Sequence, residues 1–110
     1  DEHAALVHSL EQQGINRVYS GYWVCDRLIF TSHEHIICAV LGEDMLPGLT
    51  RYQAYKGMVD SEPHSAYIFT TDGLFHPKQA IADFTRDTHY THIQVGRYLI
   101  FYEAGHKKIQ

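Results

Sequence analysis

The sequence predicts an α/β fold with three layers: a mostly parallel sheet of about five strands, helices on both faces, and a C-terminal antiparallel β-hairpin. Two observations carry this prediction. Segments with helical spacing of apolar residues alternate with short β-rich runs, as is typical of parallel α/β sheets. The last two β-rich runs, residues 91–95 and 98–103, are separated only by Gly96-Arg97, the length of a two-residue hairpin turn.

Helices and strands alternate along the chain, and local residues justify them. Residues 2–13 carry one apolar helical stripe and end at Gly14, the residue type favoured after a helix C-terminus. The continuous apolar run IICAVL is expected to form a strand buried on both faces. The expected helices cover residues 2–13, 22–30, 51–60 and 78–87, and the expected strands cover residues 15–19, 36–41, 66–70, 91–95 and 98–103.

Cap and turn residues set the boundaries between these elements. Ser20 is expected to cap the second helix, because a serine hydroxyl can accept a hydrogen bond from a free backbone N–H of the first turn. Asp72-Gly73 is a strong turn signal. Pro77 suits the first turn of the fourth helix, where a missing N–H costs nothing.

Size and composition indicate one soluble domain over residues 1–110. The chain has 45% hydrophobic and 20% charged residues, which excludes a disordered chain. Its formal net charge of −4 argues against nucleic acid as a partner, because phosphates are neutralised by a basic surface. No apolar run approaches the roughly 20 residues of a membrane helix.

Two cysteines, Cys25 and Cys38, leave two interpretations open. Neither lies in a zinc-binding spacing, and two thiols cannot build a Cys-rich metal site. They are either two buried thiols that act as small hydrophobic side chains, or a Cys25–Cys38 disulfide formed in an oxidising compartment.

Metal and catalytic patterns are weak in this sequence. His33 and His35 are two residues apart, whereas a zinc helix presents His at i and i+4, so they are weak metal candidates and are expected to be ordinary loop residues. His89 and His92 are weaker still. Because the sequence has no GxSxG elbow, dinucleotide fingerprint or phosphate loop, we expect no catalytic residue and no cofactor.

A cluster of aromatic and arginine residues gives the strongest binding candidates. The cluster begins where the first strand ends, the edge at which an open α/β sheet places its ligand crevice. An aromatic platform beside an arginine can stack on a sugar ring and hydrogen-bond its hydroxyls. Alternatively, Tyr22 and Trp23 are core residues that close the helix onto the sheet. The candidates are Tyr19, Tyr22, Trp23, Arg27, Arg51 and Tyr52.

The run GINRVYSGYWVCDRLIFTSHEHIICAV, followed by RYQAY and AYIF, resembles a domain of certain bacterial membrane glycosyltransferases. These are the dolichyl-phosphate-mannose mannosyltransferase-like enzymes of the GT-C group. The resemblance covers about residues 5–70, and Gly21 departs from it, since the family pattern has Asp or another polar residue there. The matching residues are Tyr19-Ser20-Gly21-Tyr22-Trp23, Leu28-Ile29-Phe30-Thr31-Ser32, Glu34 and Arg51-Tyr52.

The resemblance implies that the chain is an excised piece of a longer membrane protein, and the start at Asp1 without Met fits this expectation. In the family, a multi-spanning region carries the catalytic Asp and precedes a soluble C-terminal domain outside the cytoplasm. The expected function is therefore that of a non-catalytic, periplasmic domain of a polyprenyl-phosphate-sugar-dependent glycosyltransferase. Its expected partners are the membrane-embedded portion of the same polypeptide and a saccharide or lipid-linked sugar.

Two alternatives stay open beside this expectation. The first is a free-standing small α/β module with a ligand-binding or regulatory role. The second is a small metal-dependent enzyme that uses His33 and His35. Apolar segments of about 20 residues encoded upstream of Asp1 would favour the glycosyltransferase, and metal analysis of the purified protein would test the enzyme.

Overall fold

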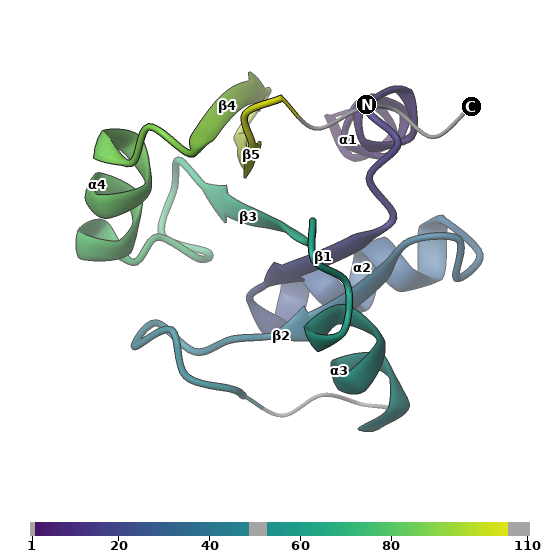
Figure 1. The fold of residues 1–110 in the computed structure, drawn as a ribbon. Coiled ribbons are helices and arrows are strands. Elements are labelled where there is room, and N and C mark those ends of the chain that lie inside the picture. Colours follow the sequence, from purple (N-terminus) through teal and green to yellow (C-terminus); the bar gives the residue numbers. More distant parts are fainter. Residues whose placement is uncertain (1, 49–52, 106–110) are drawn as a thin grey trace.

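A computed structural model describes residues 2–48 and 53–105 of the chain and confirms the predicted order of elements (Figure 1). Each helix and strand lies where the sequence predicts it, with shifts of one or two residues at the described ends. The helices are α1 (Glu2–Gln12), α2 (Tyr22–Thr31), α3 (Gln53–Asp60) and α4 (Lys78–Arg86). The strands are β1 (Arg17–Ser20), β2 (Ile37–Val40), β3 (Ala66–Thr70), β4 (Tyr90–Val95) and β5 (Tyr98–Glu103).

The five strands form one mixed sheet in the order β2-β1-β3-β5-β4. β1 pairs in parallel with β2 and β3, whereas β5 pairs antiparallel with both β3 and β4. The α/β class and the terminal hairpin are therefore confirmed, but the expected mostly parallel sheet is not. The reason is that β5 of the hairpin pairs antiparallel with β3 as well as with β4, so half of the strand pairings are antiparallel.

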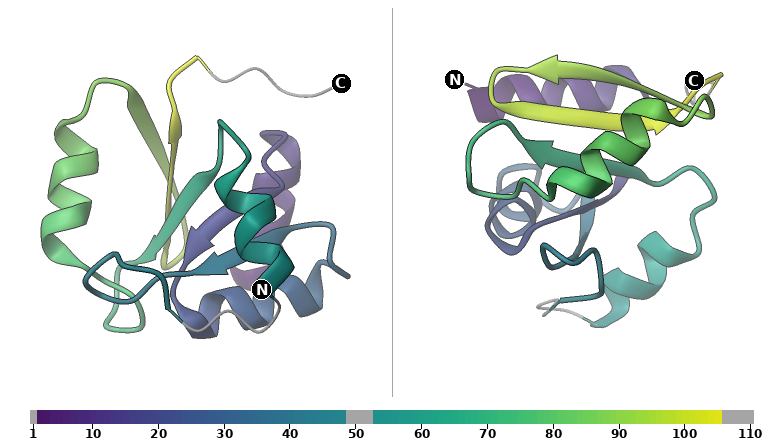
Figure 2. Two further views of the ribbon diagram at one scale, coloured as in Figure 1. Left: turned by 60° about the horizontal axis from the view of Figure 1, so that its bottom comes forward. Right: turned by 90° about the vertical axis from the view of Figure 1, so that its left-hand side faces the viewer.

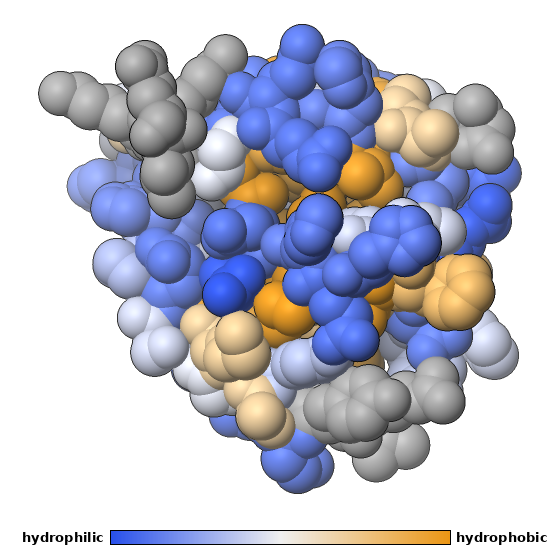
Figure 3. All heavy atoms as spheres, turned by 90° about the vertical axis from the view of Figure 1, so that its right-hand side faces the viewer, coloured by the Kyte–Doolittle hydropathy of each residue, from blue (hydrophilic) through white to orange (hydrophobic). Residues whose placement is uncertain are grey.

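Helices cover both faces of the sheet, because alternate strand residues point to opposite faces (Figure 2). On one face, α1 and α2 pack against the strands through a core that includes Leu6, Leu28, Val18 and Ile100. On the other face, α3 contributes the buried Val59 and α4 contributes Phe84. Viewed from the right-hand side of Figure 1, hydrophilic residues cover most of the surface and apolar atoms are visible between them (Figure 3).

The edge strand β2 is buried although it has only one neighbouring strand, β1, in the sheet. All four of its residues are buried, as the apolar run predicts. Burial comes from the two helices that contact β2, α2 and α3. The edge of the sheet that lies beside α2 therefore presents the apolar side chains of β2.

The expected cap at Ser20 is wrong. The N-cap of α2 is Gly21, which makes no side-chain cap hydrogen bond. Ser20 instead ends β1, where its buried hydroxyl donates to the carbonyl oxygen of Ile68 at 2.7 Å. Pro77 likewise lies one position outside the first turn, at the N-cap of α4.

Among the described residues, no helix is long and apolar enough to cross a membrane.

Candidate functional site

A disulfide between Cys25 and Cys38 joins α2 to the edge strand β2. The two Cα atoms lie 5.1 Å apart, and both residues are buried. Of the two interpretations of the cysteines, the disulfide is the one that the structure contains, while the expected burial of both residues also holds. The cross-link fastens β2 to α2, the helix that precedes it in the chain.

A groove of about 630 Å³ lies beside this disulfide. Its volume is in the range typical of small-molecule sites. Helix α2, strand β2 and the loop that connects them all contribute lining residues. The described lining residues are Tyr22, Cys25, Asp26, Arg27, Ile29, Phe30, His33, Glu34, Cys38 and Val40.

Aromatic rings and polar groups share this groove. Tyr22 begins α2 and Phe30 lies in its last turn, with 39% and 81% of their surfaces exposed. Carboxylates, a guanidinium and an imidazole come from the lining positions between and beyond these rings. A surface with exposed rings and both donors and acceptors suits a ligand that has apolar faces and polar edges.

The loop at the end of the groove has an unusual backbone. His33 and Glu34 have φ angles of 53° and 63°, in the left-handed region that non-glycine residues seldom adopt. Their N–H groups donate to the carbonyl oxygens of Phe30 and Ile29, which closes the C-terminus of α2. Glu34 also accepts a hydrogen bond from the Tyr55 hydroxyl of α3. The loop is therefore tied to helices on both faces of the sheet.

The metal candidates do not come together with further ligands in the described structure. His33 lines the groove, whereas His35 is exposed and is not among the lining residues. His89 contacts Asp87, and the His92 ring packs on Phe101 at 4.8 Å. Residues 2–48 and 53–105 hold no group of three or more His, Cys, Asp or Glu side chains arranged to bind a metal.

Of the predicted aromatic and arginine candidates, only part of the set converges. Tyr22 and Arg27 line the groove. Trp23 lies next to it, with its ring edge-to-face with Tyr22 at 5.1 Å between centroids. Arg51 and Tyr52 lie outside the described residues.

Tyr19 lies on the opposite face of the sheet from α2, so its expected place in the same crevice is wrong. Its ring stacks on Tyr67 at 5.0 Å, and its hydroxyl donates to Asp60 at 2.5 Å. Burial and, next, the Asp60 carboxylate raise the pKa of Tyr19 above its ordinary value. The physical reason is strand alternation: Val18 and Ser20 occupy the α2 side of β1, so Tyr19 must face α3 and α4.

The core interpretation of Trp23 is also wrong, because 66% of its surface is exposed. Helix α2 buries Val24, Cys25 and Leu28, which form its sheet-facing stripe. Trp23, Arg27 and Phe30, at i, i+4 and i+7, share one side of the helix, and that side faces solvent.

Seven residues that line the groove were neither binding nor metal candidates: Cys25, Asp26, Ile29, Phe30, Glu34, Cys38 and Val40. A signal existed for two of them. Tyr22, Asp26 and Phe30 follow each other at intervals of four, so they occupy neighbouring turns on one side of a helix. No sequence signal places Val40 opposite them, because this contact depends on how α2 docks beside β2.

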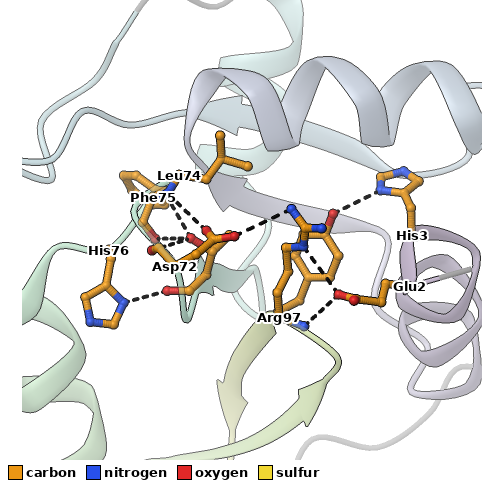
Figure 4. Close-up of polar contacts among 9 residues, drawn as sticks. Glu2, His3, Asp72, Leu74, Phe75, His76 and Arg97 are labelled. Carbon is orange, nitrogen blue, oxygen red and sulfur yellow. Dashed lines mark hydrogen bonds and ion pairs between the residues drawn. The ribbon is translucent and has the colours of Figure 1, made fainter.

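A second polar cluster surrounds the hairpin turn (Figure 4). Arg97 contacts Glu2 of α1 and Asp72 of the β3–α4 turn at 3.3 and 3.5 Å, and its backbone N–H donates to Glu2 at 2.9 Å. Gly96 has a φ angle of 57°, and a Cβ there would lie 2.6 Å from the Glu2 carboxylate. Each of these exposed ion pairs contributes little free energy. Their structural effect is that Arg97 of the hairpin turn contacts both α1 and the β3–α4 turn.

His3, next to Glu2 in the chain, is buried beside this exposed cluster. Its imidazole lies 2.6 Å from the Thr31 hydroxyl of α2 and 3.5 Å from the Tyr98 hydroxyl of β5. Burial and, next, the charge of Arg27 lower the pKa of His3 below its ordinary value of 6.5. His3 therefore joins α1 to α2 and β5 best in its neutral form.

Comparison with protein-family models, curated proteins and solved structures found no match to this chain.

Proposed function

We propose that this domain is a non-catalytic, extracytoplasmic C-terminal part of a polyprenyl-phosphate-sugar-dependent membrane glycosyltransferase of the GT-C group. The observation that carries the proposal is the Cys25–Cys38 disulfide. Structural disulfides form and persist in oxidising compartments and are rare in the cytosol. An extracytoplasmic position is therefore the setting in which this cross-link is stable.

The segment with the family resemblance supports the same proposal. It folds as the continuous unit β1, α2 and β2, in which the disulfide fastens the helix to the second strand. Two aromatic residues of the resemblance, Tyr22 and Trp23, are exposed on α2, whereas Tyr19 packs against Tyr67 on the other face of the sheet. In this role the domain assists acceptor or saccharide binding beside the membrane-embedded portion of the same polypeptide.

The departure at Gly21 has a structural counterpart. A Cβ at this position would lie 2.8 Å from the ring of Phe75. A carboxylate side chain, which the family pattern has here, would require Phe75 to move. Ligand contacts of this domain are therefore expected from the residues of α2 itself, from Tyr22 onward, and not from a side chain at position 21.

Protease accessibility tests the proposed position. An antibody raised against the domain should detect it in the membrane fraction of the source cells, as part of a larger polypeptide. Protease added to intact spheroplasts should digest the domain, and alkylation followed by mass spectrometry should find Cys25 and Cys38 oxidised. A protected cytoplasmic protein with both thiols reduced would overturn the proposal and favour a free-standing α/β module.

A further inference from the structure

The groove between α2 and β2 has lining residues from the first to the last turn of α2. Tyr22 and Phe30 both line it and are eight residues apart on one helix, which corresponds to a rise of about 12 Å. Both rings are exposed, and the lining between α2 and β2 also includes the apolar side chains of Ile29 and Val40 and the disulfide. This length suits a linear ligand of a few ring units.

The polar groups of the lining suit hydroxyl groups. The carboxylates of Asp26 and Glu34 accept hydrogen bonds, that of Glu34 already one from Tyr55, and the guanidinium of Arg27 donates them. A sugar hydroxyl is itself both donor and acceptor, and the C–H face of a pyranose packs on aromatic rings. Sugar rings therefore match both kinds of surface that the groove presents.

The charges of the lining disfavour anionic ligands. Among the described lining residues, two carboxylates stand against a single guanidinium. Phosphate and nucleotide sites instead gather cationic side chains or free backbone N–H groups. This charge balance therefore argues against an anionic ligand and is compatible with a neutral one.

We propose that this groove binds a short neutral oligosaccharide, with Tyr22 and Phe30 as the stacking residues. The proposal deepens the proposed function, on which it rests for the source of the saccharide. The disulfide gives the groove a further property. Because Cys25 belongs to α2 and Cys38 to β2, the cross-link holds these two lining elements at a fixed separation.

Titration of the oxidised domain with neutral and anionic sugars tests the proposal. The neutral probes are mannotriose, maltotriose, cellotriose and xylotriose, and the anionic probes are sialyllactose and UDP-glucose. Binding is followed by amide chemical shifts and by the fluorescence of Trp23, which lies beside the groove residue Tyr22. We expect at least one neutral trisaccharide to shift amides of residues 22–30 and 33–34 at millimolar concentration.

Three variants assign the binding to the groove. Tyr22→Ala and Phe30→Ala should each weaken it about tenfold, which corresponds to the loss of one ring contact. Leu74→Ala is the matched control, since it also removes an exposed apolar side chain but lies in the β3–α4 turn. It should leave the affinity unchanged. Amide spectra establish that each variant is folded.

Several results would overturn the proposal: no shift with any neutral probe, equal affinity in the wild type and both ring variants, or stronger binding of the anionic probes. These results are separable from failure of the proposed function. Binding is measured on the purified domain, whereas position is measured in cells. An extracytoplasmic domain that binds none of the probes would overturn the groove proposal alone, and a cytoplasmic domain that binds them would overturn only the proposed function.

Discussion

Helices α2 and α4 present aromatic residues in opposite ways. On α2, the stripe that faces the sheet is Val24, Cys25 and Leu28, and Phe30 is 81% exposed. On α4, Phe84 faces the sheet and contacts the rings of Tyr67 and Tyr90 at 4.6 and 4.8 Å. An aromatic residue on a helix therefore indicates neither core nor binding surface until the docking face of that helix is known.

The two aromatic sets meet at one point, the start of α2. The set beneath α4 includes Phe69, Phe75 and Phe101, all nearly fully buried. The ring of Phe75 packs against Gly21, the N-cap of α2. The buried set thus limits what can occupy the N-terminus of the helix that carries the exposed set.

The largest expected effect comes from truncating a ring in the buried set. Phe69→Ala should lower the free energy of unfolding by about 3–5 kcal/mol, because it leaves a cavity among packed rings. Phe30→Ala should change it by no more than about 0.5 kcal/mol, as at other exposed positions. Urea denaturation of both variants measures the difference. A comparable loss in Phe30→Ala would mean that the aromatic side of α2 is packed, which would break the comparison.

Loss of the disulfide is expected to have the second largest effect. The Cys25→Ala/Cys38→Ala variant should be destabilised by about 3 kcal/mol, because the unfolded chain gains the freedom of a loop of this length. The same loss should appear when the wild type unfolds in the presence of a reductant. Stability that is unchanged by the reductant would show that α2 is held to β2 by packing alone.

Gly21→Ala tests the meeting point of the two sets. The backbone of Gly21 is extended, with φ −72° and ψ 166°, so alanine is tolerated conformationally and only the contact with Phe75 opposes it. We expect a destabilisation of about 1–3 kcal/mol from overpacking. Gly73→Ala is the control, since a Cβ there meets nothing within 4 Å. Equal stability of the two variants would contradict the close contact with Phe75.

The smallest effect is a pH dependence at the contact between α1 and α2. His3 has a pKa below 6.5 in the folded state, so the unfolded chain binds its proton first as the pH falls. The stabilising contribution of His3 is therefore complete above about pH 6.5 and declines below it, down to the lowered pKa. Urea denaturation between pH 7.5 and pH 5 should show a shallower decline for His3→Gln than for the wild type. The exposed His8→Gln should keep the wild-type slope, and an equally shallow slope in that variant would count against His3.

Local residues predicted the elements but not all of their ends. The apolar run IICAVL and the Gly96-Arg97 turn correctly indicated a buried strand and a tight hairpin. Ser20 was misassigned because a hydroxyl at a strand–helix junction can serve either element, and the carbonyl oxygen of Ile68 on β3 binds it. That competing partner is distant in sequence, at a position no local pattern reveals.

The candidate site was predictable only in part for the same reason. Tyr22 and Arg27 follow from local clustering, but Tyr19 in that cluster faces the other side of the sheet, where it contacts Tyr67 and Asp60. The groove also needs Val40, which is brought opposite α2 by the parallel pairing of β1 with β2.

The sequence by itself determined the order and type of the elements, the hairpin and the burial of both cysteines, because periodicity and turn chemistry are local properties. The tertiary structure decided the mixed sheet, the disulfide, the outward direction of Trp23 and Phe30, and the groove. These features depend on which face of each element docks against a partner far away in the chain. That choice is made by the packing of the whole core.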